Sequence, residues 1–121
     1  MGTLALIGHI LFGGFFVIGG AMHFMKLSDM TSYTRAKGVP LPQLAVMGTG
    51  LVILLAGLGV IFDIRRTLAY LVLAAFLLVV TPIMHAFWSE TDPNMKMVDM
   101  QMFLKNMALL GAALVFYTLA V

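Results

Sequence analysis

The residues best able to do chemistry lie at the ends of long apolar segments. His23 closes the first such segment, His85 lies near the end of the third, and Lys105 lies in the opening turns of the last. The same ends carry further polar or aromatic side chains, namely Lys26, Trp88, Gln101 and Asn106. An ammonium group donates to a ligand oxygen, and an imidazole exchanges protons near neutral pH. Together these residues predict a ligand-binding site, without assigning a catalytic role to any of them.

Helical spacing supports one shared site. Gln101 and Lys105 are four residues apart on one helix face, and His85 and Trp88 are three apart on another. If the chain crosses a bilayer at each apolar segment, all these residues lie near one membrane face, called side B; the face that holds the N-terminus is side A. Ionisable groups in hydrocarbon normally face the bundle interior, where they find partners. We therefore predict one polar pocket near side B.

Simpler interpretations of the same residues remain open. Lys105 could extend along its own stem to the membrane surface, and Trp88 could belong to an aromatic belt at that surface. Each histidine could bond a backbone carbonyl. His9 precedes His23 by fourteen residues on nearly the same helix face, about 21 Å away along the axis, so it belongs nearer side A.

Metals and haem fit this pattern less well than an organic ligand. His23 and His85 could be axial ligands of a haem, but no haem motif accompanies them. A zinc site would also need Glu90 or Asp92. Thioethers suit Cu(I), but methionine is also a common filler of apolar surface, and that interpretation is preferred for Met95, Met97, Met100 and Met102. We expect neither a metal nor a haem.

The elements that must position these residues are four apolar stretches. Of the 121 residues, 62% are hydrophobic and 10% are charged, and the mean hydropathy is +1.07. The stretches cover about residues 3–25, 44–62, 67–87 and 102–120, each close to the ~20 residues that a spanning helix needs. Unbroken apolar runs of this length bond their backbone groups internally only as helices. We predict an all-α, multi-pass membrane protein, with one four-transmembrane-helix bundle as a single domain over residues 1–121.

The connections refine this picture. Between the first two helices, Ser28 or Asp29 could cap a short interfacial helix that ends by Gly38, with Met30 and Tyr33 on one face. The short connection 63–67 makes the second and third helices antiparallel neighbours, and residues 88–101 lead to the fourth. Glycines in the first two helices permit close packing, within one chain or across a homodimer. We expect the first segment to be a retained helix rather than a cleaved signal peptide.

Charge and cysteine content exclude several functions. The net charge of +2 comes from scattered Lys and Arg with no basic run, so nucleic acid is not expected as a partner. Because the chain has no cysteine, it can form neither a disulfide nor a thiol adduct. The positive residues are divided between the two membrane faces and leave the orientation open.

Four fragments together resemble the DoxX family: GHILFGGFFVIGGAMHFMKL, YTRAKGVPLPQL, HAFW and FLKNMALLGAAL. The resemblance covers about residues 8–115. It implies a multi-pass protein of a bacterial or archaeal inner membrane, since members are four-helix membrane proteins and relatives include the membrane subunit of a thiosulfate:quinone oxidoreductase. It also implies a role beside soluble redox enzymes. The candidate residues that match the recurrent pattern are His23, Lys26, His85, Trp88, Lys105 and Asn106.

Three functions follow as hypotheses. The first is a redox-accessory subunit that binds a quinone between His23, His85 and Lys105, and any enzymatic role would be that of a quinone-linked oxidoreductase subunit. The second is a non-enzymatic binder or carrier of a lipid or other small molecule in the same pocket. The third is a membrane scaffold for soluble redox enzymes, with a docking surface around Tyr33, Arg35 and Lys37.

Overall fold

The computed structural model describes residues 2–121, which fold into helices joined by short connections. In chain order they are α1 (Thr3–Met25), α2 (Leu27–Ala36), α3 (Pro42–Phe62), α4 (Arg66–Met84), the 3-10 helix η1 (Phe87–Ser89) and α5 (Pro93–Ala120). The helices α1, α3, α4 continued by η1, and α5 are each long and apolar enough to cross a membrane. The predicted all-α, four-helix membrane fold is confirmed, and α2 is the short helix expected between the first two spans.

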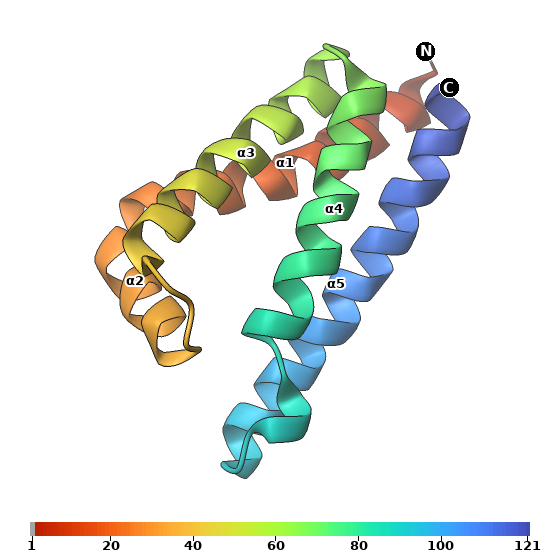
Figure 1. The fold of residues 1–121 in the computed structure, drawn as a ribbon. Helices are drawn as coiled ribbons and strands as arrows, with labels where there is room; N and C mark the ends of the chain where they lie inside the picture. The colour runs from red at the N-terminus through yellow and green to blue at the C-terminus, as the bar shows by residue number, and fades with distance from the viewer. Residues whose placement is uncertain (1) are drawn as a thin grey trace.

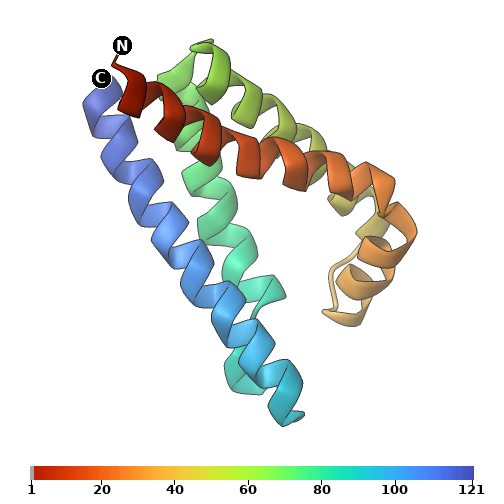
Figure 2. The ribbon, with the colours of Figure 1, turned by 180° about the vertical axis from the view of Figure 1, so that it is seen from behind.

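The four long helices form two pairs that diverge from a common end (Figure 1). One pair is α1 with α3, the other is α4 with α5, and α3 continues into α4 through a tight turn at the common end. The beginning of α1 and the end of α5 also lie at this end, which is side A. Seen from behind, the pairs again separate toward side B, where α2 packs on α3 and α1 (Figure 2). The molecule is therefore V-shaped, with α2 at the wide end.

Glycines hold α1 and α3 together. A Cβ atom on Gly13 would lie 2.7 Å from the carbonyl oxygen of Gly57, and one on Gly20 would lie 2.6 Å from that of Gly50. The two glycines on each helix are seven residues apart, about two helical turns, so they recur on the same face. No larger residue fits at these positions without moving a backbone. The two helices thus pack backbone against backbone, as small residues allow in lipid.

Aromatic side chains fill the common end of the two pairs. The ring of Phe12 lies 5.1 Å from that of Phe116 in a T-shaped arrangement and 5.9 Å from that of Tyr70. Phe16, Tyr70 and Leu73 are each at most 1% exposed. The buried core is therefore concentrated where the pairs meet, and the space between them widens toward side B.

The turn from α3 to α4 is built around unusual backbone conformations. Asp63 and Arg65 have φ values of 56° and 47°, in the left-handed region, and the N–H of Ile64 bonds the carbonyl oxygen of Gly59 at 2.9 Å. Arg66 donates through Nε and Nη2 to the carbonyl oxygen of Val60, at 3.0 and 2.8 Å. These bonds satisfy the Gly59 and Val60 carbonyls in the last turn of α3, which allows the chain to reverse within a few residues.

Four helix boundaries differ from those expected, and one of them, the start of α4 at Arg66 rather than 67, differs by a single residue. The helix α3 begins at Pro42 rather than 44, α4 ends at Met84 rather than 87, and α5 begins at Pro93 rather than 102. Pro82 weakens the last turn of α4. Asp92 caps α5 by accepting a hydrogen bond from the N–H of Asn94 at 3.2 Å, with Pro93 in the first turn. The connection before α5 is therefore short, and its expected second half is helix.

Candidate functional site

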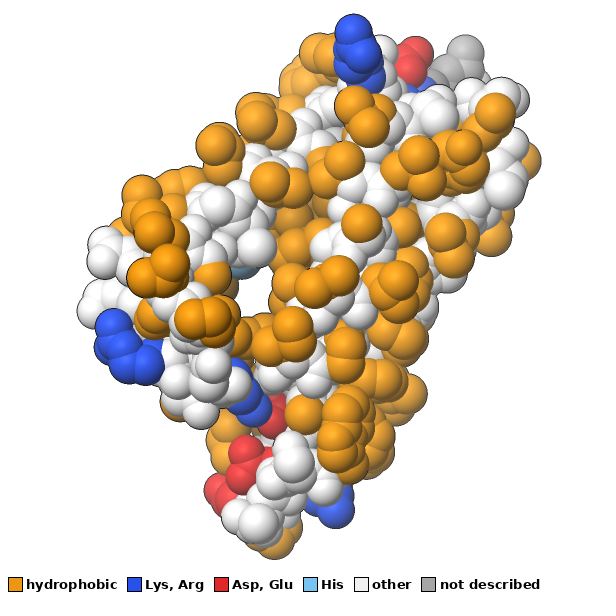
Figure 3. Space-filling view, in the orientation of Figure 1, with side chains coloured by type: hydrophobic (Ala, Val, Ile, Leu, Met, Phe, Trp, Pro, Cys, Tyr) orange, Lys and Arg blue, Asp and Glu red, His pale blue; other side chains and the backbone are white. Residues whose placement is uncertain are grey.

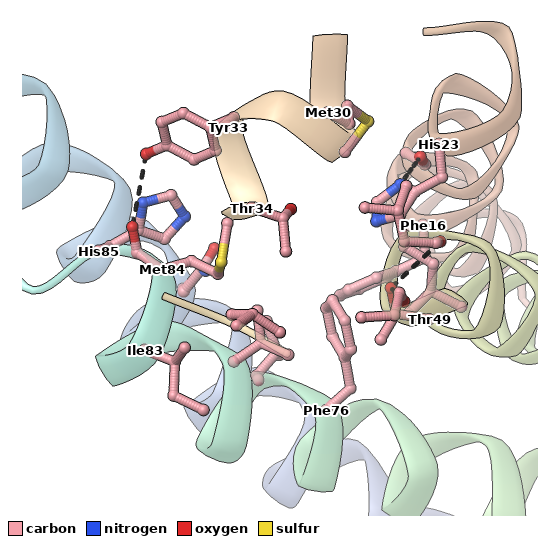
Figure 4. A pocket seen from close by; sticks show the side chains of 18 of the residues that line it. Phe16, His23, Met30, Tyr33, Thr34, Thr49, Phe76, Ile83, Met84 and His85 are labelled. Atoms are coloured by element: carbon pink, nitrogen blue, oxygen red, sulfur yellow. Dashed lines mark hydrogen bonds between the residues drawn. The ribbon is translucent and has the colours of Figure 1, made fainter. Parts of the chain in front are cut away.

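A cavity of about 350 Å³ occupies the space between the two helix pairs. Its walls are mainly apolar, with Phe15 and Phe16 from α1 and Phe76 from α4, while Met30 and Thr34 of α2 lie at its side B end. Figure 3 shows the molecule hollowed between α3 and α4, and Figure 4 shows the side chains that surround the space. This cavity is the candidate site.

Four of the seven residues proposed from sequence line the cavity, namely His23, His85, Lys105 and Asn106. They come from α1, from the end of α4 and from α5, so the fold brings distant parts of the chain together. Asn106 is 8% exposed. The other three residues do not line the cavity: Lys26 and Gln101 are exposed, and Trp88 is 57% exposed. Trp88 instead packs edge-on against Phe87 and Phe103.

His23 projects into the cavity from α1 with a defined tautomer. Its Nδ1 lies 2.6 Å from the carbonyl oxygen of Gly19. A carbonyl oxygen only accepts, so Nδ1 carries the hydrogen and Nε2 of the neutral ring accepts. The second ring nitrogen is turned toward the cavity (Figure 4). The backbone bond expected under the simpler interpretation is present, and the ring still presents a proton acceptor to the site.

His85 faces the cavity from the opposite wall (Figure 4). It follows the last turn of α4, and its Nδ1 lies 3.4 Å from Oδ1 of Asp99. Because a carboxylate oxygen accepts, Nδ1 of the neutral imidazole again carries the hydrogen and leaves Nε2 as the acceptor. The two histidines thus offer the same chemical group from opposite sides.

Asp99 is a further residue of this region that was not among the predicted site residues. Its side chain is 0% exposed, and it receives hydrogen bonds from Lys37 Nζ at 2.9 Å and from the Tyr33 hydroxyl at 3.2 Å. The Tyr33 hydroxyl also lies 3.4 Å from the carbonyl oxygen of Met84. A buried carboxylate needs such partners. We call Asp99, Tyr33, Lys37 and His85 the Asp99 cluster.

The Asp99 cluster connects the two arms of the V. Tyr33 lies on α2, and Lys37 is the first residue after that helix. His85 and Asp99 belong to the α4–α5 pair. The backbone of α2 packs on α3 and α1. The bonds to Asp99 therefore join the wide ends of the two pairs and enclose the cavity on side B.

Electrostatics keep the partners of Asp99 in their hydrogen-bonding forms. Burial raises the pKa of Tyr33; the Lys37 ammonium lowers it, and the Asp99 carboxylate raises it further. For Lys37, burial lowers the pKa, but the hydrogen bond to Asp99 and the attraction of Tyr33 and Asp99 raise it above its ordinary value. At neutral pH, Lys37 is charged and Tyr33 retains its proton.

Lys105 differs from Lys37 because it has no acidic partner among the described residues. Its Nζ lies 5.0 Å from the centre of the Phe15 ring and 3.5 Å from the sulfur of Met102. Within residues 2–121, no carboxylate lies within ion-pairing distance of this ammonium group. Lys105 can therefore donate to a ligand oxygen in the cavity.

Sequence reasoning missed the Asp99 cluster although a signal existed. Asp99 is an isolated acidic residue just before an apolar run, and Tyr33 and Lys37 are four residues apart. Tyr33 and Lys37 were expected at a surface that docks soluble enzymes. In the structure both bond Asp99, while Tyr33 at 37% exposure and Arg35 remain exposed.

Comparison with known proteins identifies the family. The DoxX family model matches residues 4–86, from the start of α1 to just beyond α4. Helix α5, with Asp99, Lys105 and Asn106, lies outside the matched range. Searches of curated proteins and of solved structures gave no significant match. Because the family model covers more than half of the chain and the fold is a four-helix membrane fold, this protein belongs to the DoxX family.

Proposed function

We propose that this protein is a redox-accessory subunit that binds a quinone in the cavity between its two helix pairs. The supporting observation is the placement of His23 and His85 on opposite walls of an aromatic-lined, mainly apolar space (Figure 4). A quinone head is a flat ring with oxygen atoms at opposite edges. Such a ring matches a space with apolar walls and polar groups at both sides.

Each part of the ligand has a matching environment. The ring would pack against Phe15, Phe16 and Phe76, and one oxygen would lie near Lys105 and Asn106. The long apolar tail of a membrane quinone would leave between α3 and α4, where the molecule is hollowed (Figure 3). The tail would then lie in lipid, as it does in the free quinone pool.

The polar groups suit both redox forms. The N–H groups of Lys105 and Asn106 would donate to the carbonyl oxygens of the quinone. The Nε2 atoms of His23 and His85 would accept from the hydroxyls of the quinol. A positive charge beside the ring favours the reduced, more anionic form. Electrons would come from a soluble redox enzyme at the membrane surface. Because this chain has no cysteine, it would take no part in thiol chemistry itself.

This proposal places the protein in a membrane that contains quinones, the inner membrane of a bacterial or archaeal cell. The second candidate is a non-enzymatic carrier of lipids or other small apolar molecules. It is favoured by the mostly apolar lining and by the opening between α3 and α4 (Figure 3). A carrier would hold the same ligand without any change in its oxidation state.

The test is the content of the purified protein. An organic extract of the wild type, analysed by mass spectrometry, should contain near-stoichiometric quinone, and the His85→Ala and Lys105→Ala variants should lose it. Lys26→Ala is the matched control, because Lys26 is exposed and does not line the cavity. Enrichment of another lipid would favour the carrier, and empty protein in all preparations would overturn both proposals.

A further inference from the structure

A second cavity, of about 470 Å³, lies at side A between the beginning of α1, the beginning of α4 and the end of α5. These three segments meet at the common end of the V (Figures 1 and 2). At its rim, Leu4 and Leu119 are 85% and 78% exposed. In a bilayer, such residues face lipid, so the cavity opens toward the acyl chains. It shares no lining residue with the candidate quinone site.

Tyr70 gives this cavity a hydroxyl group that has no hydrogen-bond partner among residues 2–121. The residue is 1% exposed, and its ring lies 5.6 Å from that of Phe116 and 6.5 Å from that of His9. No described residue forms a hydrogen bond with its hydroxyl, unlike the Tyr33 hydroxyl, which has two acceptors. Within residues 2–121, the hydroxyls of Thr31 and Thr81 are also buried without a partner, but neither residue lines this cavity, whereas Tyr70 does. Buried hydroxyls are normally bonded, and a ligand in the cavity would supply the bond.

Two further polar side chains line the same space. Nδ1 of His9 lies 2.6 Å from the carbonyl oxygen of Ala5, so Nε2 of the neutral ring is an acceptor. Arg66 holds the Val60 carbonyl through Nε and Nη2, and its Nη1 lies 3.4 Å from Asp63. A guanidinium has five N–H groups, so Arg66 retains donors for a ligand.

Charge and position identify the ligand class. Arg66 is the first residue of α4, where the positive end of the helix dipole favours an anion. Arg65 adds a second positive charge at this end, against the single carboxylate of Asp63 in the turn. Basic pockets between membrane helices at headgroup depth bind anionic lipids. The rim directs a long apolar chain outward, which favours a lipid over a free anion.

From these observations we propose that the side A cavity is a binding site for an anionic phospholipid. The phosphate accepts hydrogen bonds from the Tyr70 hydroxyl and Arg66, a headgroup hydroxyl donates to Nε2 of His9, and an acyl chain passes between Leu4 and Leu119. The proposal does not depend on quinone binding, because the two cavities are separate.

The test compares phosphatidylglycerol with phosphatidylcholine of the same acyl chains, each titrated into detergent-purified full-length protein and followed by native mass spectrometry. The wild-type protein should bind phosphatidylglycerol more tightly than phosphatidylcholine. Tyr70→Phe keeps the ring and removes the hydroxyl, so it should weaken that binding about tenfold. Tyr117 is partly buried and does not line the cavity, so Tyr117→Phe should leave phosphatidylglycerol binding unchanged.

Equal affinity for the two lipids, or unchanged phosphatidylglycerol binding by a folded Tyr70→Phe variant, would overturn the proposal. Thermal unfolding in the same detergent establishes whether that variant is folded. If it is not, His9→Phe replaces it, because this change keeps an aromatic ring beside Tyr70 and removes Nε2. It should weaken phosphatidylglycerol binding more than phosphatidylcholine binding, and an equal effect on both would refute the site.

Discussion

Neutralising Asp99 should loosen the wide end of the V. The Asp99→Asn variant keeps the shape of the side chain but removes the charge that pairs with Lys37 Nζ at 2.9 Å. Breaking a buried ion pair costs about 3–5 kcal/mol when its partner stays buried. The Lys37 side chain is 17% exposed and can turn partly toward water. We therefore expect Asp99→Asn to lower the free energy of unfolding by about 2–3 kcal/mol.

A double-mutant cycle with Lys37→Met measures this interaction directly. Lys37→Met alone leaves the Asp99 carboxylate buried beside Tyr33 and His85 without its strongest partner, so it should also destabilise the protein. The double variant removes both charges and should be more stable than the two separate losses predict. We expect a coupling energy of about 2 kcal/mol.

The assay is reversible unfolding in mixed micelles, followed by circular dichroism as the denaturing detergent increases. Hydrogen exchange should also rise in α2 more than in the middle of α1, because the cluster joins α2 to α5 whereas glycine contacts hold α1 to α3. Additive effects of the two substitutions, with a coupling below about 0.5 kcal/mol, would show that the pair does not hold the arms together.

Three further predictions concern packing, pH and the ligand. Gly57→Ala should cost about 1–3 kcal/mol, because its Cβ would lie 2.6 Å from the Gly13 carbonyl oxygen, whereas Gly14→Ala meets nothing within 4 Å and should be neutral; micelle unfolding checks both. Because the pKa values of Lys37 and Tyr33 are raised, their stabilising contributions should be complete at neutral pH and fall only as pH rises above about 10; a pH series should show a smaller fall in Lys37→Met. Trp88→Ala should retain the extracted quinone seen in wild type, because Trp88 is 57% exposed and does not line the cavity. Loss of the quinone from the mass spectra of this variant would contradict this placement.

The fold could be predicted from the sequence more completely than the site, and the reason is physical. Spanning helices are local objects, since about twenty consecutive apolar residues suffice to define one. The start of α5 was misplaced because hydropathy fades before Gln101, although Asp92 and Pro93 carry the capping signal. Hydropathy detects the lipid-spanning part of a helix, and capping chemistry detects where the helix begins.

The site depended on contacts that no local pattern encodes. Tyr33 and Asp99 are 66 residues apart in the chain, and Lys37 and Asp99 are 62 apart. Trp88 was placed with His85 because residues three apart share a helix face, but α4 ends at Met84 and this relation no longer holds. The placement of His23, His85, Lys105 and Asn106 around one cavity follows from alternate membrane crossings, which the sequence does specify.

The glycine contacts of α1 and α3 also determine which dimension of the cavity can vary. Backbone contact at these glycines leaves the neighbouring side chains little room to rearrange, so this pair should move as a rigid body. The angle between the arms is then controlled by the left-handed residues Asp63 and Arg65 at one end and by the Asp99 carboxylate at the other. We expect the length of this turn, more than the size of the lining side chains, to set the width of the molecule that the protein admits.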